Sequence, residues 1–257
     1  MLSKTNLLLA VPPTEMMAAQ GFGLTLAHMA YRVGGGPHLF RANLPVPVRG
    51  GVMLIDDAGF DGRGDPAPFC QEVVRECAAR GYTGVICDFD RHLPLLGQVI
   101  AGLSPLLAKR GWPLYVPEPY GRYSATAKVL IPTALSGGSL QVRLQEAVQQ
   151  YGAARVALAV ERSAEDFFLP SPNGQGIRLT QEELQQRIQE REPVIFFSNE
   201  LCAHYFTYMN RQNGAHFILF DDAASIRKKL HTARSLDIAD ALLLYPEVSD
   251  LLTEILR

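Results

Sequence analysis

The chain has 257 residues, of which 47% are hydrophobic and 19% are charged, and its formal net charge is -2 at pH 7. This length suits one large α/β domain or two small ones with a sizeable core. Scattered basic residues on a nearly neutral chain argue against a nucleic-acid partner. No stretch is long and apolar enough to form a membrane span.

The four cysteines and six histidines show no spacing typical of a metal or redox site, so neither a metal nor another cofactor is expected. Cys87 lies inside an apolar run, where a reduced and buried thiol is the expected state. The apolar run at 7–11 stops at Pro12 and Pro13, and it is shorter than the core of a signal peptide. We therefore expect a first buried strand at 7–11 and a cytoplasmic protein.

Short runs rich in Val, Ile and Leu recur along the chain, with helical periodicity between many of them. The runs are residues 7–11, 52–55, 83–89, 113–116, 128–131, 155–160, 216–220 and 241–245, and the predicted helices are 67–81, 93–111, 139–152, 180–192 and 224–236. Apolar strands that alternate with helices indicate a parallel sheet covered on both faces. Their number and the chain length match a (β/α)8 TIM barrel in the α/β class. A doubly wound open sheet is the alternative, but its glycine fingerprint is missing.

Two stretches break the alternation. Residues 34–50 are rich in Gly and Pro and are expected to be extended, with a turn at 33–38. Residues 161–220 contain a loop, a helix and the aromatic segment 196–210. We therefore predict a single TIM-barrel domain over 1–257, with an α+β insertion at 161–220 on the rim before the last strand.

The stretch GYTGVICDFDRH, residues 81–92, reads as a buried strand that ends in two carboxylates. Because side chains alternate along a strand, Asp88, Asp90 and Ile86 should face the same side, the barrel interior. Two carboxylates this close raise the pKa of one of them, which suits a general acid. The structural alternative is that Asp90 caps the next helix and Asp88 accepts bonds from neighbouring strands. Asp56 and Asp57, which follow the apolar run at 52–55, are further candidates on the same face.

The same stretch resembles the fourth barrel strand of the family 18 glycoside hydrolases, the chitinase-like enzymes, whose pattern is D-G-x-D-x-D-x-E. Thr83 and Gly84 match the opening of the pattern, and Asp88 matches its last Asp. Ile86 stands where another Asp is usual, and Asp90 stands in place of the catalytic Glu. The catalytic motif is therefore divergent.

The C-terminal quarter resembles the end of the same family: a strand, two aspartates, Ser-Ile, a lysine, a helix and a last strand that ends in an aromatic residue. Asp222, Ser225 and Lys228 or Lys229 fall on this pattern, and Tyr245 replaces the usual Trp. From the residues alone, Asp222 is a helix N-cap with Ser225 in the first turn, and the lysines form a solvated helix face. Tyr245 is either a core residue or a platform on which a sugar stacks.

The resemblance extends over about residues 50–257 and implies a barrel that acts on or binds glycans containing N-acetylglucosamine. The family works by substrate assistance and retains the anomeric configuration: the 2-acetamido oxygen attacks, the last Asp orients it, and the Glu protonates the leaving oxygen. Carried onto this sequence, Asp88 orients the acetamido group and Asp90 is the acid. Asp90 is one methylene shorter than Glu, so weak or absent hydrolysis is expected.

Further binding residues are expected near this strand. The family's sixth strand usually ends in Met-x-Tyr-Asp, but residues 129–138 contain neither Tyr nor Asp. Glu118 and Tyr120, which follow the presumed fifth strand, are candidate replacements. Tyr205, in the aromatic segment 196–210, is another candidate for substrate binding.

Three functions stay open at this point. The first is a divergent family 18 hydrolase, and the second is a barrel that has lost the reaction and serves as a glycan-binding or protein-interaction surface. The third is an unrelated TIM-barrel enzyme. The sequence identifies neither the glycan and its linkage nor the oligomeric state.

Overall fold

Eight parallel strands close into a barrel in the computed structural model, which describes residues 5–43, 48–171, 174–210 and 214–257. In chain order the barrel strands are β1 (Asn6–Val11), β2 (Thr25–Gly34), β4 (Val52–Asp56), β5 (Val85–Asp88), β6 (Leu114–Pro117), β7 (Lys128–Pro132), β8 (Val156–Val160) and β14 (Asp240–Leu244). Each pairs with the next, and β14 pairs back onto β1, which closes the ring. The predicted TIM barrel is confirmed.

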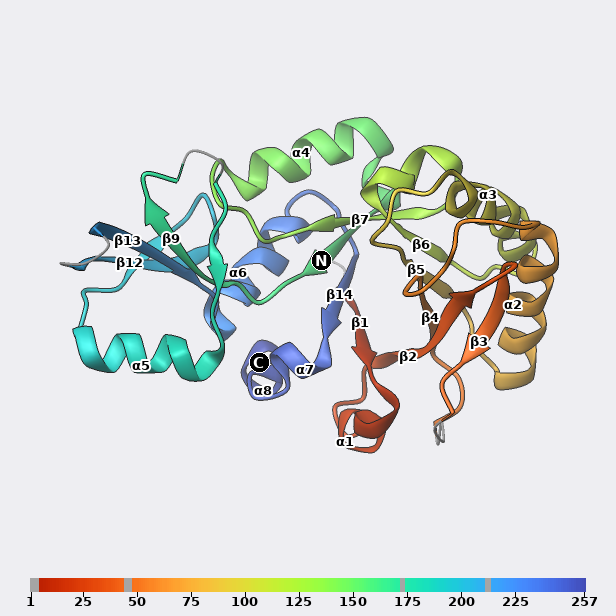
Figure 1. Cartoon of the computed structure of the whole chain (residues 1–257), viewed down its shortest axis with the longest axis horizontal. Helices are drawn as coiled ribbons and strands as arrows, with labels where there is room; N and C mark the ends of the chain where they lie inside the picture. Colours follow the sequence, from red (N-terminus) through yellow and green to blue (C-terminus); the bar gives the residue numbers. More distant parts are fainter. Residues whose placement is uncertain (1–4, 44–47, 172–173, 211–213) are drawn as a thin grey trace.

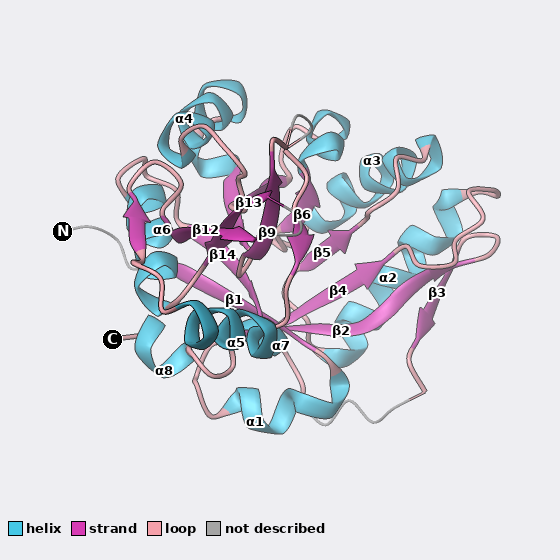
Figure 2. Ribbon diagram, turned by 60° about the vertical axis from the view of Figure 1, so that its left-hand side comes forward, coloured by secondary structure: helices cyan, strands magenta, loops and turns pink. Residues whose placement is uncertain are grey.

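Helices lie outside these strands (Figure 2). They are α1 (Met16–Gln20), α2 (Pro66–Arg80), α3 (Pro94–Ala108), α4 (Leu140–Tyr151), α6 (Ala223–Arg234), α7 (Tyr245–Val248), α8 (Leu252–Ile255) and the 3-10 turns η1 (Pro13–Glu15), η2 (Glu118–Tyr123) and η3 (Ala153–Arg155). In α2, Phe69, Val73 and Cys77 recur at helical spacing, and all three are buried. Gly81 ends α2 in the left-handed region at φ 73°, a conformation that favours glycine.

Two apolar cores share the barrel strands, because successive side chains point to opposite sides. The larger core lies between the strands and the helices. The smaller one fills the barrel and consists of Leu8, Ala10, Ala27, Val52, Leu54, Ile86, Tyr115, Leu130 and Ala157. A polar residue two positions after an interior residue, at the C-terminal end of its strand, therefore faces the mouth of the barrel.

A buried polar cluster closes the opposite, N-terminal end of the barrel. Asp240 accepts hydrogen bonds from Asn6 at 2.7 Å and from the Tyr115 hydroxyl at 3.3 Å, and it pairs with Lys128. β8, which separates β14 from β7, contributes only the small Ala157 at this level, so Lys128 can reach across to Asp240. The barrel is therefore a packed core rather than a channel.

The eight apolar runs are not the eight barrel strands. Residues 216–220 form an antiparallel strand outside the barrel, and β2 takes the second barrel position. The polar residues His28 and Arg32 interrupt the apolar pattern of β2, although His28 is fully buried and bonds the Gly50 carbonyl at 2.9 Å. β3 (His38–Arg41), within the stretch expected to be extended, pairs antiparallel with β2.

A second sheet lies at one side of the barrel (Figure 1). In the chain it falls between β8 and β14, and its strands are β9 (Ala164–Leu169), β10 (Ile177–Arg178), β11 (Phe196–Ser198), β12 (Ala203–Asn210) and β13 (Gly214–Phe220). One face packs against α5 (Gln181–Arg191) through Leu184, Phe206 and Ile218. The capping box of Thr180 and Glu183 begins α5, within the helix predicted at 180–192.

Asp221 holds the two ends of this second sheet together where they join the barrel. Its carboxylate accepts hydrogen bonds from the Ser163 backbone at 2.8 Å and the Ser225 hydroxyl at 2.7 Å, and it pairs with Lys229 at 2.6 Å. Lys229 is 1% exposed, so the expected solvated face holds for Lys228 and is wrong for Lys229. Asp222 caps α6 with Ser225 as predicted.

Lys229→Met should destabilise the protein by about 3 kcal/mol, because it leaves the buried Asp221 carboxylate without its counter-charge. Lys228→Met makes the same chemical change one residue earlier on the exposed side of α6 and should cost less than about 0.5 kcal/mol. Urea unfolding of both variants measures the difference. Equal losses in the two variants would contradict the role given to this pair.

Candidate active site

Two carboxylates end neighbouring strands on the interior side of the barrel. Asp56 ends β4 and Asp88 ends β5, and the two residues are directly paired in the register of these strands. Leu54 and Ile86, two positions earlier, belong to the interior core. Asp56 and Asp88 therefore lie side by side at the C-terminal mouth, as predicted for a barrel with an acidic fourth strand.

Asp88 has the properties of a proton donor. Burial by the surrounding protein raises the pKa of its carboxyl to about 6, and the charges of Asp90, Asp56 and Asp57 add to this effect. Its side chain still reaches solvent at the mouth, and no described residue hydrogen-bonds its carboxylate. Burial also raises the pKa of Asp56, while Arg32 acts in the opposite direction.

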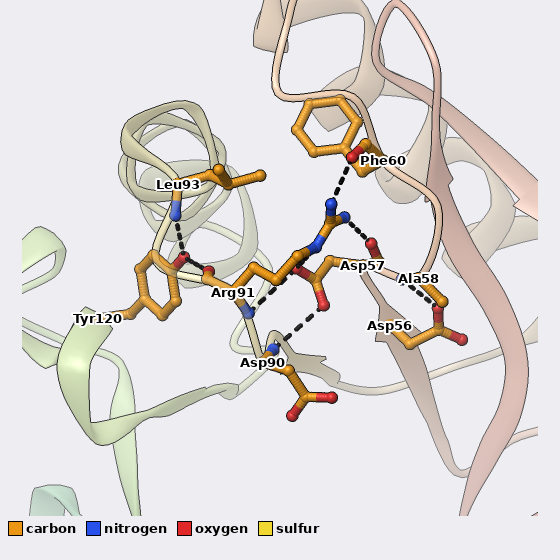
Figure 3. Close-up of polar contacts among 8 residues, drawn as sticks. All are labelled: Asp56, Asp57, Ala58, Phe60, Asp90, Arg91, Leu93 and Tyr120. Atoms are coloured by element: carbon orange, nitrogen blue, oxygen red, sulfur yellow. Dashed lines mark hydrogen bonds and ion pairs between the residues drawn. The ribbon is translucent and has the colours of Figure 1, made fainter.

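Asp90 is held through its backbone, and its side chain is free. Its amide donates to Asp57 at 3.1 Å, and its exposed carboxylate points away from Asp57 and Arg91 (Figure 3). The N-cap of α3 is Leu93, and no side chain caps that helix. The alternative in which Asp90 is a helix cap is therefore wrong, and within the described part of the chain its carboxylate has no partner.

Asp57 fixes the loop that carries Asp90. This carboxylate is 3% exposed and accepts bonds from the Arg91 amide at 3.3 Å and the Arg91 Nε at 3.1 Å, as well as from Asp90. Arg91 also donates to the Phe60 carbonyl at 2.6 Å. Two adjacent aspartates at the end of β4 thus differ in their surroundings: Asp57 is fully engaged in structure, and Asp56 faces the mouth.

The tyrosines proposed as binding residues lie elsewhere. Tyr120 is buried in the outer core, and its hydroxyl donates to the Arg91 carbonyl and accepts from the Leu93 amide. Tyr245 alternates with the interior Leu244 and is also buried in the outer core, with its ring 6.3 Å from that of Phe22. Neither ring lines the barrel interior.

Tyr205 and Glu118 also have partners within the protein. The Tyr205 ring stacks on Phe196 at 5.5 Å and on Phe217 at 5.3 Å, so neighbouring rings cover both of its faces. Glu118 pairs with Arg143 of α4. These contacts account for the positions of both side chains without a bound ligand.

Glu161 is a mouth residue that the sequence analysis missed. It follows β8, whose interior residues are Ala157 and Ala159, so the same alternation that places Asp88 directs Glu161 to the mouth. Burial is the largest cause of the raised pKa of its carboxyl, followed by the nearby Glu247. The signal was present in the run VALAVE, where small residues alternate with branched ones before the acid.

No three His, Cys, Asp or Glu side chains of the described residues are grouped so that they could hold a metal ion. Within the same residues, no helix combines the length and the apolar character that crossing a membrane requires.

Asp57→Ala should destabilise the protein by about 2–3 kcal/mol, because it removes a buried charged acceptor from Asp90 and Arg91. Asp56→Ala is the matched control: it removes a carboxylate whose one backbone bond, from Ala58 at 2.8 Å, is offset by repulsion from its acidic neighbours. We expect a change within about 0.5 kcal/mol there. Denaturant unfolding of both variants measures the two changes in the free energy of unfolding. A smaller loss of stability in Asp57→Ala than in Asp56→Ala would contradict the structural role given to Asp57.

Asp88→Asn should stabilise the protein above about pH 6, with the gain vanishing near pH 4. Because the pKa of Asp88 is raised by folding, the folded state is favoured while the carboxyl is protonated and loses that advantage as pH rises. Thermal unfolding of wild type and variant across this pH range measures the trend. Asp61→Asn, at an exposed loop position, is the control, and the same trend there would count against Asp88.

No family model matches the chain, and no curated protein matches its sequence. Its structure resembles the spore cortex-lytic enzyme SleL of Bacillus megaterium QM B1551, with a TM-score of 0.67 and 16% identity over 95% of this chain and 71% of that one. A chitinase from Chromobacterium violaceum ATCC 12472 aligns with a TM-score of 0.65 and 14% identity, over 96% of this chain and 97% of that one. For a class V chitinase from Pseudomonas fluorescens Pf-5 the values are 0.62 and 14%, over 97% and 99%. At such identities the likeness shows the fold: this chain has the (β/α)8 barrel of the chitinase-like glycosidases.

Proposed function

We propose that this protein binds N-acetylglucosamine-containing glycans at the mouth of its barrel and hydrolyses them weakly or not at all. The observation that carries the proposal is the pair Asp88 and Asp90 at the end of the fourth barrel strand. Both carboxylates lack a partner among the residues that the structure describes, and structural neighbours with the same fold include chitinases. Unpaired carboxylates at this end of a barrel are typical of a catalytic or binding site.

In the proposed reaction the acetamido oxygen of the substrate attacks the anomeric carbon while the bond to the leaving oxygen breaks. Asp88 accepts a hydrogen bond from the acetamido N–H and so holds the group in position. Asp90 gives its proton to the leaving oxygen, and it recovers a proton when water opens the cyclic intermediate. The raised pKa of Asp88 keeps a second exchangeable proton beside Asp90 at mildly acidic pH.

The anchoring of Asp90 supports weak hydrolysis. An aspartate is one methylene shorter than the glutamate of the family pattern, and a displacement of about 1 Å can cost about 10²-fold in rate. The hydrogen bond of the Asp90 amide to the buried Asp57 limits movement of the backbone toward the substrate. Binding depends less on this distance, which favours glycan binding without efficient turnover as the second candidate function.

Asp90→Glu should raise turnover of N-acetylglucosamine oligomers by about 10²-fold, because the longer side chain brings the acid nearer to the leaving oxygen. Asp90→Asn, which keeps the size of the side chain without its proton, should abolish any turnover and leave binding within a factor of about two. Product release by chromatography and binding by calorimetry give the two readouts.

The outcomes of this experiment are distinct. Turnover in wild type that is lost in Asp90→Asn would mark a working hydrolase with an aspartate acid. Binding in all three proteins with turnover in Asp90→Glu alone would mark a glycan-binding barrel. Absence of both binding and turnover would exclude these glycans as ligands.

We also propose that the protein works in a reducing compartment, the cytoplasm. All four cysteines are buried and unpaired, as expected where thiols stay reduced. Burial raises the pKa of Cys70 to about 11 and that of Cys77 to about 12, so both thiols are protonated and poorly reactive.

A further inference from the structure

A cavity of about 440 Å³ adjoins the mouth between the barrel and the second sheet. Its polar lining comes from Ser136 in the loop after β7, Glu161 and Ser163 after β8, Glu165 in β9, and Gln175. The volume lies within the range of small-ligand sites. Glu161 is also the interior-facing residue at the end of β8, so the cavity shares this residue with the mouth of the barrel.

The cavity carries negative charge that the protein does not balance. The side-chain carboxylates of Glu161 and Glu165 have no hydrogen bond or ion pair with any residue of the described ranges, although the Glu161 amide donates to the Thr133 hydroxyl at 3.3 Å. The cations that act on the Glu161 carboxyl are Lys229 and Arg178. Lys229 is paired with Asp221 inside the protein, and Arg178 is paired with Glu247.

Ser163, a mostly buried residue, adds a hydroxyl to this wall. The residue is 6% exposed, and its backbone, not its side chain, makes the bonds to Asp221. No partner for the hydroxyl occurs in the part of the chain that the structure describes. A hydroxyl without a protein partner that a mostly buried residue presents to a cavity indicates a position for a polar ligand group.

Glycines bring the opposite wall close to these groups. A Cβ on Gly176 would lie 3.1 Å from Oε2 of Glu165 and 3.0 Å from the Phe167 ring, and one on Gly174 would lie 3.2 Å from the Ser136 hydroxyl. Gly174 also has a φ of 61°. The absence of side chains at these two positions lets the backbone approach Glu165 and Ser136 closely without filling the cavity.

We propose that this cavity binds an amino sugar with a free ammonium group, so that the preferred ligand is a partly de-N-acetylated glycan. This inference rests on the proposed function and specifies the ligand of the same mouth. The ammonium group lies between Glu161 and Glu165, and the Ser163 hydroxyl bonds the sugar. An acetamido group at this point is neutral and leaves both carboxylates unpaired.

The physical reason is the cost of two uncompensated carboxylates at a partly buried wall. Each loses hydration there, and burial and neighbouring carboxylates raise the pKa of Glu161 for that reason. A cation within hydrogen-bond distance restores a favourable interaction with both. Binding should therefore weaken at high salt and as the pH falls through the raised pKa of Glu161.

The experiment compares a glucosamine tetramer with an N-acetylglucosamine tetramer by calorimetry, at low and high salt, on the intact protein. Wild type should bind the amino tetramer about tenfold more tightly at low salt. Glu161→Gln and Glu165→Gln should each remove most of this preference. Glu182→Gln removes the same charge from exposed α5 and should leave the preference unchanged.

The failures of the two proposals are distinguishable. Equal or tighter binding of the acetylated tetramer by wild type overturns the amino-sugar site and leaves the glycan proposal standing. A preference that Glu182→Gln abolishes as fully as Glu161→Gln reflects general charge and also overturns the site, as does equal affinity for a lysine tetrapeptide. Binding of neither tetramer overturns both proposals, and circular dichroism of each variant confirms that it is folded.

Discussion

The buried carboxylate of Asp221 fixes how the second sheet joins the barrel, and the geometry of the mouth follows from it. Asp221 bonds Ser163, where the chain leaves the barrel, and pairs with Lys229 on the helix that follows the chain's return. Because these groups are cut off from water, their geometry is fixed more strictly than that of a surface pair. Glu161 and Glu165 lie two residues to either side of Ser163. Their separation, and with it the cavity, therefore depends on this one contact.

Acidic residues at the two ends of the barrel have different roles. At the N-terminal end Asp240 has three partners and helps to close the interior. At the mouth, Asp57 is equally well bonded, whereas Asp88 and Asp90 next to it are not paired. Asp57 and Asp240 show that this fold can supply partners to carboxylates at both ends of the barrel. Asp88 and Asp90, which have none, are therefore candidates for a functional role. This contrast between bonded and unpaired carboxylates supports the mouth as the candidate site more strongly than the number of acidic residues does.

The sequence predicts the barrel and its acidic strand because both depend on local periodicity. The apolar pattern of β5 and the helical spacing in α2 need no tertiary information. The same approach overlooks β2, because the buried His28 is accommodated by a bond to the Gly50 carbonyl that spacing does not reveal. It also misplaces Lys229 on the solvated face, because its partner Asp221 lies before the start of α6. Tyr245 shows a further limit: a shift of one residue moves a side chain from the interior to the outer core. The tertiary partners in these cases cannot be read from spacing.

The unpaired carboxylates at the mouth couple binding of the proposed ligand to the protonation of Glu161. Glu161 gives up its proton less readily than an ordinary glutamate, because burial and Glu247 disfavour its charge. A bound ammonium group reverses that preference, so on the proposed ligand binding releases a proton at mildly acidic pH. Burial raises the pKa of the Asp88 carboxyl to about 6, and repulsion from its acidic neighbours adds to this effect. On the proposed function Asp88 accepts the acetamido N–H in its charged form, so this contact is favoured as the pH rises above that value. On the proposed ligand, the unpaired carboxylates of Glu161 and Glu165 are the property that selects a cationic glycan.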